Sequence, residues 1–364
     1  MKVLSAPIPF LKDTIMHYYQ FILGCQQNYA DGEKIAAILD SLGYEPSEDK
    51  AADLIVIIAC SVRQKAVDRI WGMINNWRKQ NPSRKYILCG CVIDNDKKKI
   101  QSDVDLILDS REIGQLPKYL KDLKMPYRQS GEISRKPVSE IGYVSIGVGC
   151  NNFCSYCAVP YARGREEYFA VDQIISETKD LVSKGCKEIM LLAQNVNSYK
   201  SEYIGKVYSF PDLLQEIDNI DGDFQISFLS PHPKDTSDEL IEIIAKLKKV
   251  KKEIHLPLQS GDDEILKKMN RHYTGVQYLE LVKKIRRKIP NVFLSTDIIV
   301  GFPTETEEQF QNTLKIVKAA KFDKAYVSQY SSRKGTVATK IYPDDVSKDE
   351  KKRRWKLLDD LINH

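Results

Sequence analysis

Short apolar segments alternate with amphipathic helical patterns along the chain, and this alternation constrains the fold more than any other feature. The run Leu54–Ala59 (LIVIIA) contains no polar residue, which predicts a strand buried on both faces. Strand–helix alternation predicts a parallel sheet covered by helices, with ligands bound at the carboxyl ends of the strands. In residues 1–125 the expected strands are Tyr19–Leu23, Leu54–Ala59, Tyr86–Gly90 and Val104–Leu108.

Two helices are expected between these strands. Asp31 is a candidate N-cap for the first helix, and Gly43 is a good stop signal. The second helix is expected over Gln64–Gln80. The apolar positions that define the first helix are Ile35, Ile38, Leu39 and Leu42.

A longer alternation begins at Tyr143 and contains six strand–helix units. This number predicts a partial (β/α) barrel whose chemistry lies at the carboxyl ends of the strands. The expected strands are Tyr143–Val148, Glu188–Leu192, Gln225–Leu229, Ile254–Leu258, Phe293–Val300 and Ala325–Tyr330.

Helices with caps are expected between the barrel strands. One spans Val171–Val182, with apolar residues at helical spacing. Thr236 with Glu239 would cap a second helix, which ends near Leu247, and Thr306 with Gln309 would cap a third.

The expected fold class is α/β, with a parallel-sheet domain followed by the barrel. We place the first domain at residues 1–125, a polar linker at 126–140, and the barrel at 141–345. Residues 346–364 are expected to form a charged amphipathic helix.

Composition narrows the class of protein. The 55 Lys and Arg exceed the 50 Asp and Glu by five, which neither requires nor excludes a nucleic-acid partner. The mixture of 42% hydrophobic and 29% charged residues excludes disorder as the main state. No apolar run approaches the ~20 residues needed to cross a bilayer, and no signal peptide is recognisable. We therefore expect a cytoplasmic monomer without membrane contact, in which clustered thiols bind metal or act in catalysis.

Three cysteines directly follow the first expected barrel strand, in a C-x3-C-x2-C pattern. We call Cys150, Cys154 and Cys157 the barrel cysteines. Three thiolates on one loop favour an iron–sulfur cluster with its fourth iron open, which can bind and reduce a substrate. The alternative is a structural zinc site, but no fourth Cys or His follows nearby.

Three more cysteines lie at the expected carboxyl ends of strands in the first domain. We call Cys25, Cys60 and Cys91 the N-terminal cysteines. Because parallel strand ends meet at one edge, these residues could hold a second cluster. The alternative is that they are buried core residues. Periodicity leaves the choice between Cys89 and Cys91 open, and we interpret Cys186 as structural.

The segment GCNNFCSYCAVPYARGRE (149–166) resembles the cluster-binding loop of radical S-adenosylmethionine (SAM) enzymes, and more closely that of the methylthiotransferases. The resemblance covers nearly the whole chain. CSVR-x-KA and QNVNSY are typical of the MiaB-type branch, which modifies tRNA. Segments similar to the family motifs are GCQQNYADGEK, ACSVRQKA, CGCVID, QNVNSY, SPHPKD, HLPLQSGDDEILKKMNRHYT and TDIIVGFPTET.

Three features depart from the family pattern. Ile58-Ala59-Cys60 replaces a common Asn-Thr-Cys, and Gln225 stands where Arg is common. Family members usually carry a C-terminal RNA-binding TRAM domain, whereas this sequence ends at His364, with the helix that would lead into it. We therefore expect a form without TRAM, which binds RNA weakly.

The resemblance implies two 4Fe–4S clusters. The barrel cysteines would hold the cluster that cleaves SAM to a 5′-deoxyadenosyl radical. The N-terminal cysteines, with Cys91 as the third ligand, would hold a cluster that carries or donates sulfur. The implied partners are a tRNA anticodon stem-loop, an electron donor such as a flavodoxin or ferredoxin, and a sulfur source.

The implied product carries a methylthio group on carbon 2 of an isopentenyl-modified adenosine next to the anticodon. Alternatives are a threonylcarbamoyl-adenosine in tRNA or a ribosomal-protein aspartate. A non-catalytic iron–sulfur protein that binds RNA is the alternative from another class.

Several residues near the expected strand ends are candidates for SAM contacts. Tyr156 could pack on the adenine, or be a core aromatic. Gly301 would let the backbone approach a ligand, or form a tight turn. Candidates for the polar end of SAM, which could equally cap strands, are Gln194, Ser230, His255 and Gln259.

Four basic residues beside the cysteine motifs are candidates for contacts to tRNA phosphate. The alternative for each is a solvated surface side chain. These residues are Arg63, Lys65, Arg163 and Arg165.

Overall fold

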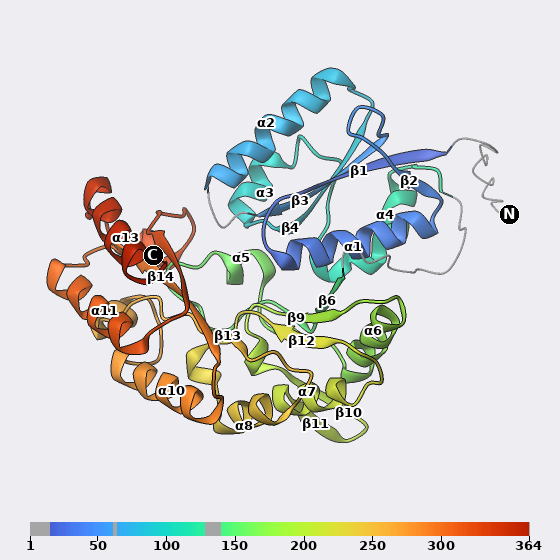
Figure 1. The fold of residues 1–364 in the computed structure, drawn as a ribbon. Coiled ribbons are helices and arrows are strands. Elements are labelled where there is room, and N and C mark those ends of the chain that lie inside the picture. The colour runs from blue at the N-terminus through green and yellow to red at the C-terminus, as the bar shows by residue number, and fades with distance from the viewer. Residues whose placement is uncertain (1–14, 61–63, 128–139, 364) are drawn as a thin grey trace, which may run out of the picture. The chain divides into compact units, whose positions relative to one another are not determined.

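The computed structural model describes residues 15–60, 64–127 and 140–363, which form two compact units (Figure 1). Unit 1 comprises residues 1–60, 65–92 and 96–136, and unit 2 comprises residues 61–64, 93–95 and 137–364. Most of the predicted linker lies outside the described residues. None of the described helices is long and apolar enough to span a membrane.

Unit 1 is built on a five-stranded parallel sheet with the strand order β2-β1-β3-β4-β5. The four predicted strands are confirmed with small shifts of their ends, and β3 is buried along its length except at its last residue. The additional strand β2 is only three residues long, too short for a periodic pattern. The strands are β1 (Met16–Ile22), β2 (Tyr44–Pro46), β3 (Leu54–Cys60), β4 (Lys85–Cys91) and β5 (Leu106–Ile107).

Helices cover both faces of this sheet (Figure 1). Alternate residues of β3 pack into two apolar clusters, one against α1 and α4 and the other against α2 and α3. The helices are α1 (Gln26–Ser41), α2 (Gln64–Gln80), α3 (Asp94–Ile100), the 3-10 helix η1 (Ser110–Gln115) and α4 (Leu116–Asp122).

The prediction that Asp31 caps the first helix is wrong. The helix α1 begins at Gln26, with Cys25 as its N-cap, so that Asp31 lies in its second turn. There the buried Asp31 carboxylate accepts a hydrogen bond from Gln27 Nε2 at 3.1 Å. The predicted stop is confirmed, because Gly43 follows the C-cap with a φ of 79°.

Unit 2 contains the six predicted barrel strands, all parallel. They form two sheets in the orders β6-β9-β12 and β13-β14-β15, and an isolated bridge between Ile226 and Val250 joins β12 to the segment before β13. The strands are β6 (Ile141–Ser145), β9 (Glu188–Leu192), β12 (Gln225–Phe228), β13 (Glu253–His255), β14 (Phe293–Val300) and β15 (Lys324–Gln329). Two antiparallel pairs are inserted, β7 (Gly147–Val148) with β8 (Glu167–Tyr168) and β10 (Lys200–Tyr203) with β11 (Lys206–Ser209).

The larger helices lie outside the curved sheet (Figure 1). Their apolar faces share one core with the barrel strands. The α-helices of unit 2 are α5 (Val159–Arg163), α6 (Val171–Ser183), α7 (Phe210–Asp218), α8 (Asp238–Lys246), α9 (Asp263–Lys268), α10 (Gly275–Lys288), α11 (Glu307–Ala320), α12 (Val337–Ile341) and α13 (Lys348–Asn363). Two 3-10 helices, η2 (Val196–Ser198) and η3 (Pro233–Asp235), follow strands β9 and β12.

One of the two predicted capping pairs is correct. Thr306 and Gln309 form a capping box at α11. At α8 the cap is Ser237 rather than Thr236. The Thr236 hydroxyl is instead hydrogen-bonded to the backbone oxygen of His232 at 3.1 Å, within the turn before the helix.

Candidate functional site

The barrel cysteines lie together on the loop between β7 and α5, just past the carboxyl end of β6. Cys150 and Cys154 are buried and Cys157 is half-buried, and none of the three forms a disulfide bond. Burial raises the pKa of the Cys150 thiol to about 11. The loop therefore presents three unoxidised sulfur atoms at the barrel end where the sequence predicts the chemistry.

The start of this loop is fixed by backbone contacts. Gly149 has a φ of 89°, and a Cβ at this position would lie 2.0 Å from the backbone oxygen of Arg165, so only glycine fits. Its amide donates to Gln194 Oε1 at 2.5 Å, and Cys150 N donates to Gly164 O at 3.1 Å. Gln194, a predicted SAM contact, thus braces the cysteine loop.

A second segment, far away in sequence, holds the middle of the loop. Ser155 N donates to Met269 O at 3.0 Å, and Ser155 Oγ donates to Lys268 O at 2.7 Å. The Asn270 side chain donates to the backbone oxygens of Asn152 and Phe153, both at 3.0 Å. The turn after α9 and the cysteine loop are therefore tied by four hydrogen bonds.

Arg271 follows this turn and was not singled out by sequence reasoning. Its guanidinium is buried and donates from Nη1 to Cys154 Sγ at 3.4 Å. It also donates to Tyr273 Oη at 3.0 Å and to the backbone oxygen of Pro257 at 3.1 Å. Arg271 lies within the segment HLPLQSGDDEILKKMNRHYT that resembles a family motif, but the motif does not reveal the contact to Cys154, which lies in another segment of the chain.

Three buried polar atoms at the carboxyl ends of successive barrel strands have no hydrogen-bond partner. They belong to Asn195 after β9, His232 after β12 and Gln259 after β13. Gln259 was predicted, whereas Asn195 and His232 are neighbours of the predicted Gln194 and Ser230. Since unpaired buried polar groups are costly, these atoms are candidates for binding a polar ligand.

His232 is held as a neutral imidazole. Burial and the nearby Arg271, Lys234 and His272 lower the pKa of His232 to about 2. Its Nδ1 accepts from Lys234 N at 3.3 Å, which leaves Nε2 as an unpaired donor.

Other predicted SAM contacts are placed as follows. His255 lies at the end of β13, with Nε2 3.2 Å from Asp297 Oδ2 and Nδ1 3.0 Å from Ser295 Oγ. Tyr156 packs against an apolar cluster that contains Phe302 and Met269, and burial raises its pKa. The functional roles of these side chains, and of Ser230, remain predictions.

Gly301 occupies a tight turn after β14. Its φ is 67°, and a Cβ there would lie 2.3 Å from Lys351 Cγ. Its amide donates to Glu305 Oε2 at 2.6 Å. Close packing against α13 therefore explains why this position requires glycine. A contact of Gly301 to SAM stays a prediction.

The predicted phosphate contacts differ from one another in exposure. Arg163 is buried, whereas Arg165 is exposed and stacks over the Phe153 ring at 4.3 Å from its centroid. Arg163 therefore does not fit the interpretation as a solvated surface residue. Arg63 and the Lys65 side chain lie outside the described residues.

The N-terminal cysteines meet at the carboxyl edge of the unit 1 sheet. Cys60 and Cys91 are register partners at the ends of β3 and β4, and Cys25 caps α1 after β1. A Cβ on Gly24 would lie 3.1 Å from Cys60 Cβ, so the Cys25 turn contacts the end of β3. Cys89 is packed into the apolar core, which favours Cys91 as the third ligand.

The described residues contain no three His, Cys, Asp or Glu side chains that converge on a single metal ion. A structural zinc site requires such convergence. A 4Fe–4S cluster has four irons and commonly one cysteine on each, so its ligands are more widely spaced. None of the six cysteines forms a disulfide bond, and the ligation of a cluster by either set stays a prediction.

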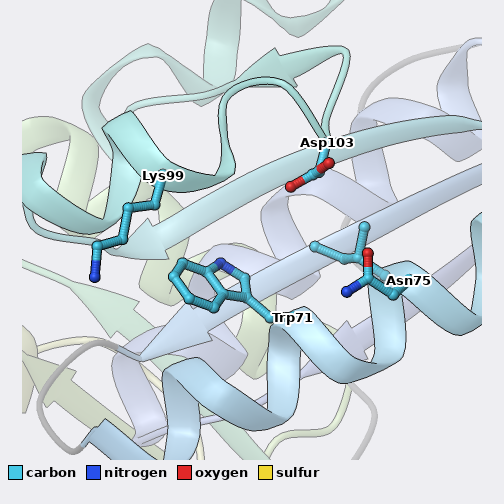
Figure 2. Close-up of a pocket in the computed structure, with 5 residues that line it drawn as sticks. Trp71, Asn75, Lys99 and Asp103 are labelled. Carbon is cyan, nitrogen blue, oxygen red and sulfur yellow. The ribbon is translucent and has the colours of Figure 1, made fainter.

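A pocket of about 180 Å³ lies elsewhere in unit 1, between α2 and the region of α3 (Figure 2). Lys99 Nζ lies 5.4 Å from the centroid of the Trp71 ring. None of the predicted site residues lines this pocket, whose lining is Trp71, Ile74, Asn75, Lys99 and Asp103.

Comparison with known proteins agrees with this geometry. Residues 144–317 match the model of the radical SAM superfamily, and residues 17–109 match that of the uncharacterized protein family UPF0004. The fold is similar to that of the radical SAM methyltransferase TsrM from Kitasatospora setae, with a TM-score of 0.65 and 13% identity over 90% of this chain and 77% of that chain. It is also similar to the radical SAM enzyme OxsB, with a TM-score of 0.59 and 12% identity over 94% of this chain and 56% of that chain. The fold and the cysteine loop thus define a radical SAM enzyme, a class that uses a 4Fe–4S cluster and SAM.

More similar relatives define the family. The tRNA-2-methylthio-N(6)-dimethylallyladenosine synthase of Clostridium botulinum strain Loch Maree is 42% identical over 93% of this chain and 80% of its own length. The synthase of the same name from Carboxydothermus hydrogenoformans is 41% identical over 95% of this chain and 83% of its own length. The chain belongs to this MiaB-type family of radical SAM methylthiotransferases, which confirms the resemblance in its sequence.

Proposed function

We propose that this enzyme methylthiolates carbon 2 of an isopentenyl-modified adenosine next to the anticodon of tRNA, using two 4Fe–4S clusters. The observation that carries the proposal is the presence of two sets of three cysteines outside any disulfide bond, each at the carboxyl edge of its own parallel sheet. The names of the relatives supply the substrate.

The barrel cysteines are proposed to hold the cluster that binds SAM. A cluster held there would, once reduced, supply the electron for cleavage of SAM to a 5′-deoxyadenosyl radical. The protein's part is to position the groups and exclude water, since a primary carbon radical reacts with most neighbours. Unpaired polar atoms of Asn195, His232 and Gln259 are available to orient a polar ligand at the strand ends.

The N-terminal cysteines are proposed to hold the second cluster, at which sulfur is carried or donated. Their thiols, which form no disulfide bond and lie at the ends of adjacent strands, fit this role. The tRNA must present an unstacked loop base, as RNA usually does in sequence-specific recognition. The reaction would also need a second SAM that donates the methyl group to the sulfur, an electron donor such as a flavodoxin or ferredoxin, and a sulfur source.

The first test concerns the metal. After anaerobic reconstitution, the chain should contain about eight iron atoms. Replacement of all three barrel cysteines by Ala should remove about half of them, whereas Cys186→Ala should remove none, because Cys186 is buried in the apolar core. Full iron content in the triple variant would refute the assignment of the barrel cysteines.

The second test separates the two sites. Replacement of all three N-terminal cysteines by Ala should preserve reductive cleavage of SAM to 5′-deoxyadenosine but abolish methylthiolation. The matched control is Cys89→Ala, which removes a core thiol two residues from Cys91 and should retain methylthiolation. Methylthio product from the triple variant would exclude a sulfur-handling role for these cysteines.

A further inference from the structure

A buried arginine charge lies beside one of the barrel cysteines. Arg271 is 6% exposed, and its guanidinium donates hydrogen bonds to one thiol, one hydroxyl and one backbone oxygen. Among the residues that the structure describes, no carboxylate forms an ion pair with it. Because burying an unpaired charge is expensive, a negative partner is expected at this position.

The contact to Cys154 is built into the fold. Asn270, directly before Arg271, has a φ of 58° and ties the turn to the backbone of Asn152 and Phe153. The Tyr273 hydroxyl, which accepts from Arg271 Nε, itself donates to Leu258 O at 2.8 Å. The guanidinium therefore has little freedom to turn away from the sulfur.

We propose that Arg271 is a positioning residue that donates a hydrogen bond to the Cys154 ligand sulfur and raises the reduction potential of the barrel cluster. A thiolate-ligated cluster supplies the negative charge that the guanidinium lacks. Reduction adds one further negative charge, so a fixed cation and a hydrogen bond to the sulfur favour the reduced state. This inference rests on the proposed cluster at the barrel cysteines.

The test is a redox titration of the reconstituted full chain, monitored by electron paramagnetic resonance. The signal of the barrel cluster is identified by its loss in the barrel-cysteine triple variant. Arg271→Gln should lower the equilibrium constant for one-electron reduction about tenfold, which is a shift of about 59 mV to more negative potential. Arg271→Lys keeps the charge but loses the planar fork of donors, so its shift should be smaller.

The matched control is Arg286→Gln on α10. Arg286 pairs with Asp323 at 3.5 Å, just before β15, at the amino end of the barrel strands. Its replacement changes the net charge equally and should leave the potential unchanged.

An unchanged potential in Arg271→Gln with normal iron content would overturn the inference, as would an equal shift in Arg286→Gln. If Arg271→Gln fails to hold the cluster, Arg271→Lys decides between the outcomes. A lowered reduction potential in Arg271→Lys supports the inference, and a wild-type potential overturns it. These outcomes are distinct from failure of the proposed function, which appears as full iron content in the barrel-cysteine triple variant.

Discussion

His232 shows how the barrel interior controls the charge of a single side chain. The residue is buried beside Arg271, and its pKa is about 2 in the folded chain against 6.5 in the unfolded chain. The His232 imidazole therefore stays neutral in the folded chain over a pH range in which it takes up a proton in the unfolded chain. Stability from this residue is present above pH 6.5 and is lost as the pH falls toward 2.

We predict that His232→Asn removes this dependence. Asparagine can still accept from Lys234 N, as His232 Nδ1 does, but it does not titrate. Between pH 6.5 and 5.5 the wild-type free energy of unfolding should fall by about 1 kcal/mol more than that of the variant. Urea unfolding of the metal-free proteins at both pH values measures this difference. If wild type and variant lose the same unfolding free energy between the two pH values, the neutral imidazole is contradicted.

At the residue scale, sequence reasoning identified groups with a characteristic spacing. The barrel cysteines follow such a spacing within one loop, and their positions in the fold agree with it. Asn195, His232 and Arg271 were missed, because their significance comes from burial and from contacts with distant segments. All three lie within segments that resemble family motifs, but the motifs alone do not tell which residue is buried or what it contacts.

At the scale of elements, the terminal helix α13 is anchored by a buried ion pair. Arg354 Nη1 lies 2.8 Å from Glu305 Oε2, and both residues are about 4% exposed. Glu305 also accepts from the Gly301 amide after β14. The amphipathic pattern predicted the helix, but not the carboxylate with which its arginine pairs.

We predict that Arg354→Met destabilises the fold by about 3–5 kcal/mol, because it leaves the Glu305 carboxylate buried without a cation. Burial already raises the pKa of Glu305. The difference in unfolding free energy between wild type and Arg354→Met should therefore shrink as the pH falls and the carboxyl becomes protonated. Denaturant unfolding measures the loss.

The control on the same helix is Arg353→Met, which removes ion pairs of exposed side chains with Glu307 and Glu350. Such pairs are worth at most about 1 kcal/mol. Equal losses in the two variants would show that Arg354 contributes no more than a surface charge.

Strand and helix positions were largely predictable, since apolar periodicity reports which face is buried. The starts of α1 and α8 were misplaced because Asp31 and Thr236 have the chemistry of caps but are bonded elsewhere. The cap positions are taken by Cys25, six residues before Asp31, and by Ser237, directly after Thr236. Local propensity cannot choose between candidate caps when tertiary contacts decide.

At the scale of the whole molecule, the α/β class and the positions of most strands along the chain followed from the sequence. The net charge of +5 carried no information about a partner, because the balance is small for a chain of 364 residues. The family was recognisable because its motifs extend over both units. The fold alone does not identify the methylthiolated substrate, so an experiment must establish it.

The most direct test of the account uses the anaerobically reconstituted enzyme with SAM, a reductant, sulfide and tRNA that carries isopentenyl-adenosine. Nucleosides from the digested tRNA are analysed by mass spectrometry, with tRNA lacking the isopentenyl group as the control. The account predicts 2-methylthio-isopentenyl-adenosine from the modified tRNA alone. Absence of this product, with a methylthio group instead on threonylcarbamoyl-adenosine or on a ribosomal-protein aspartate, would contradict it.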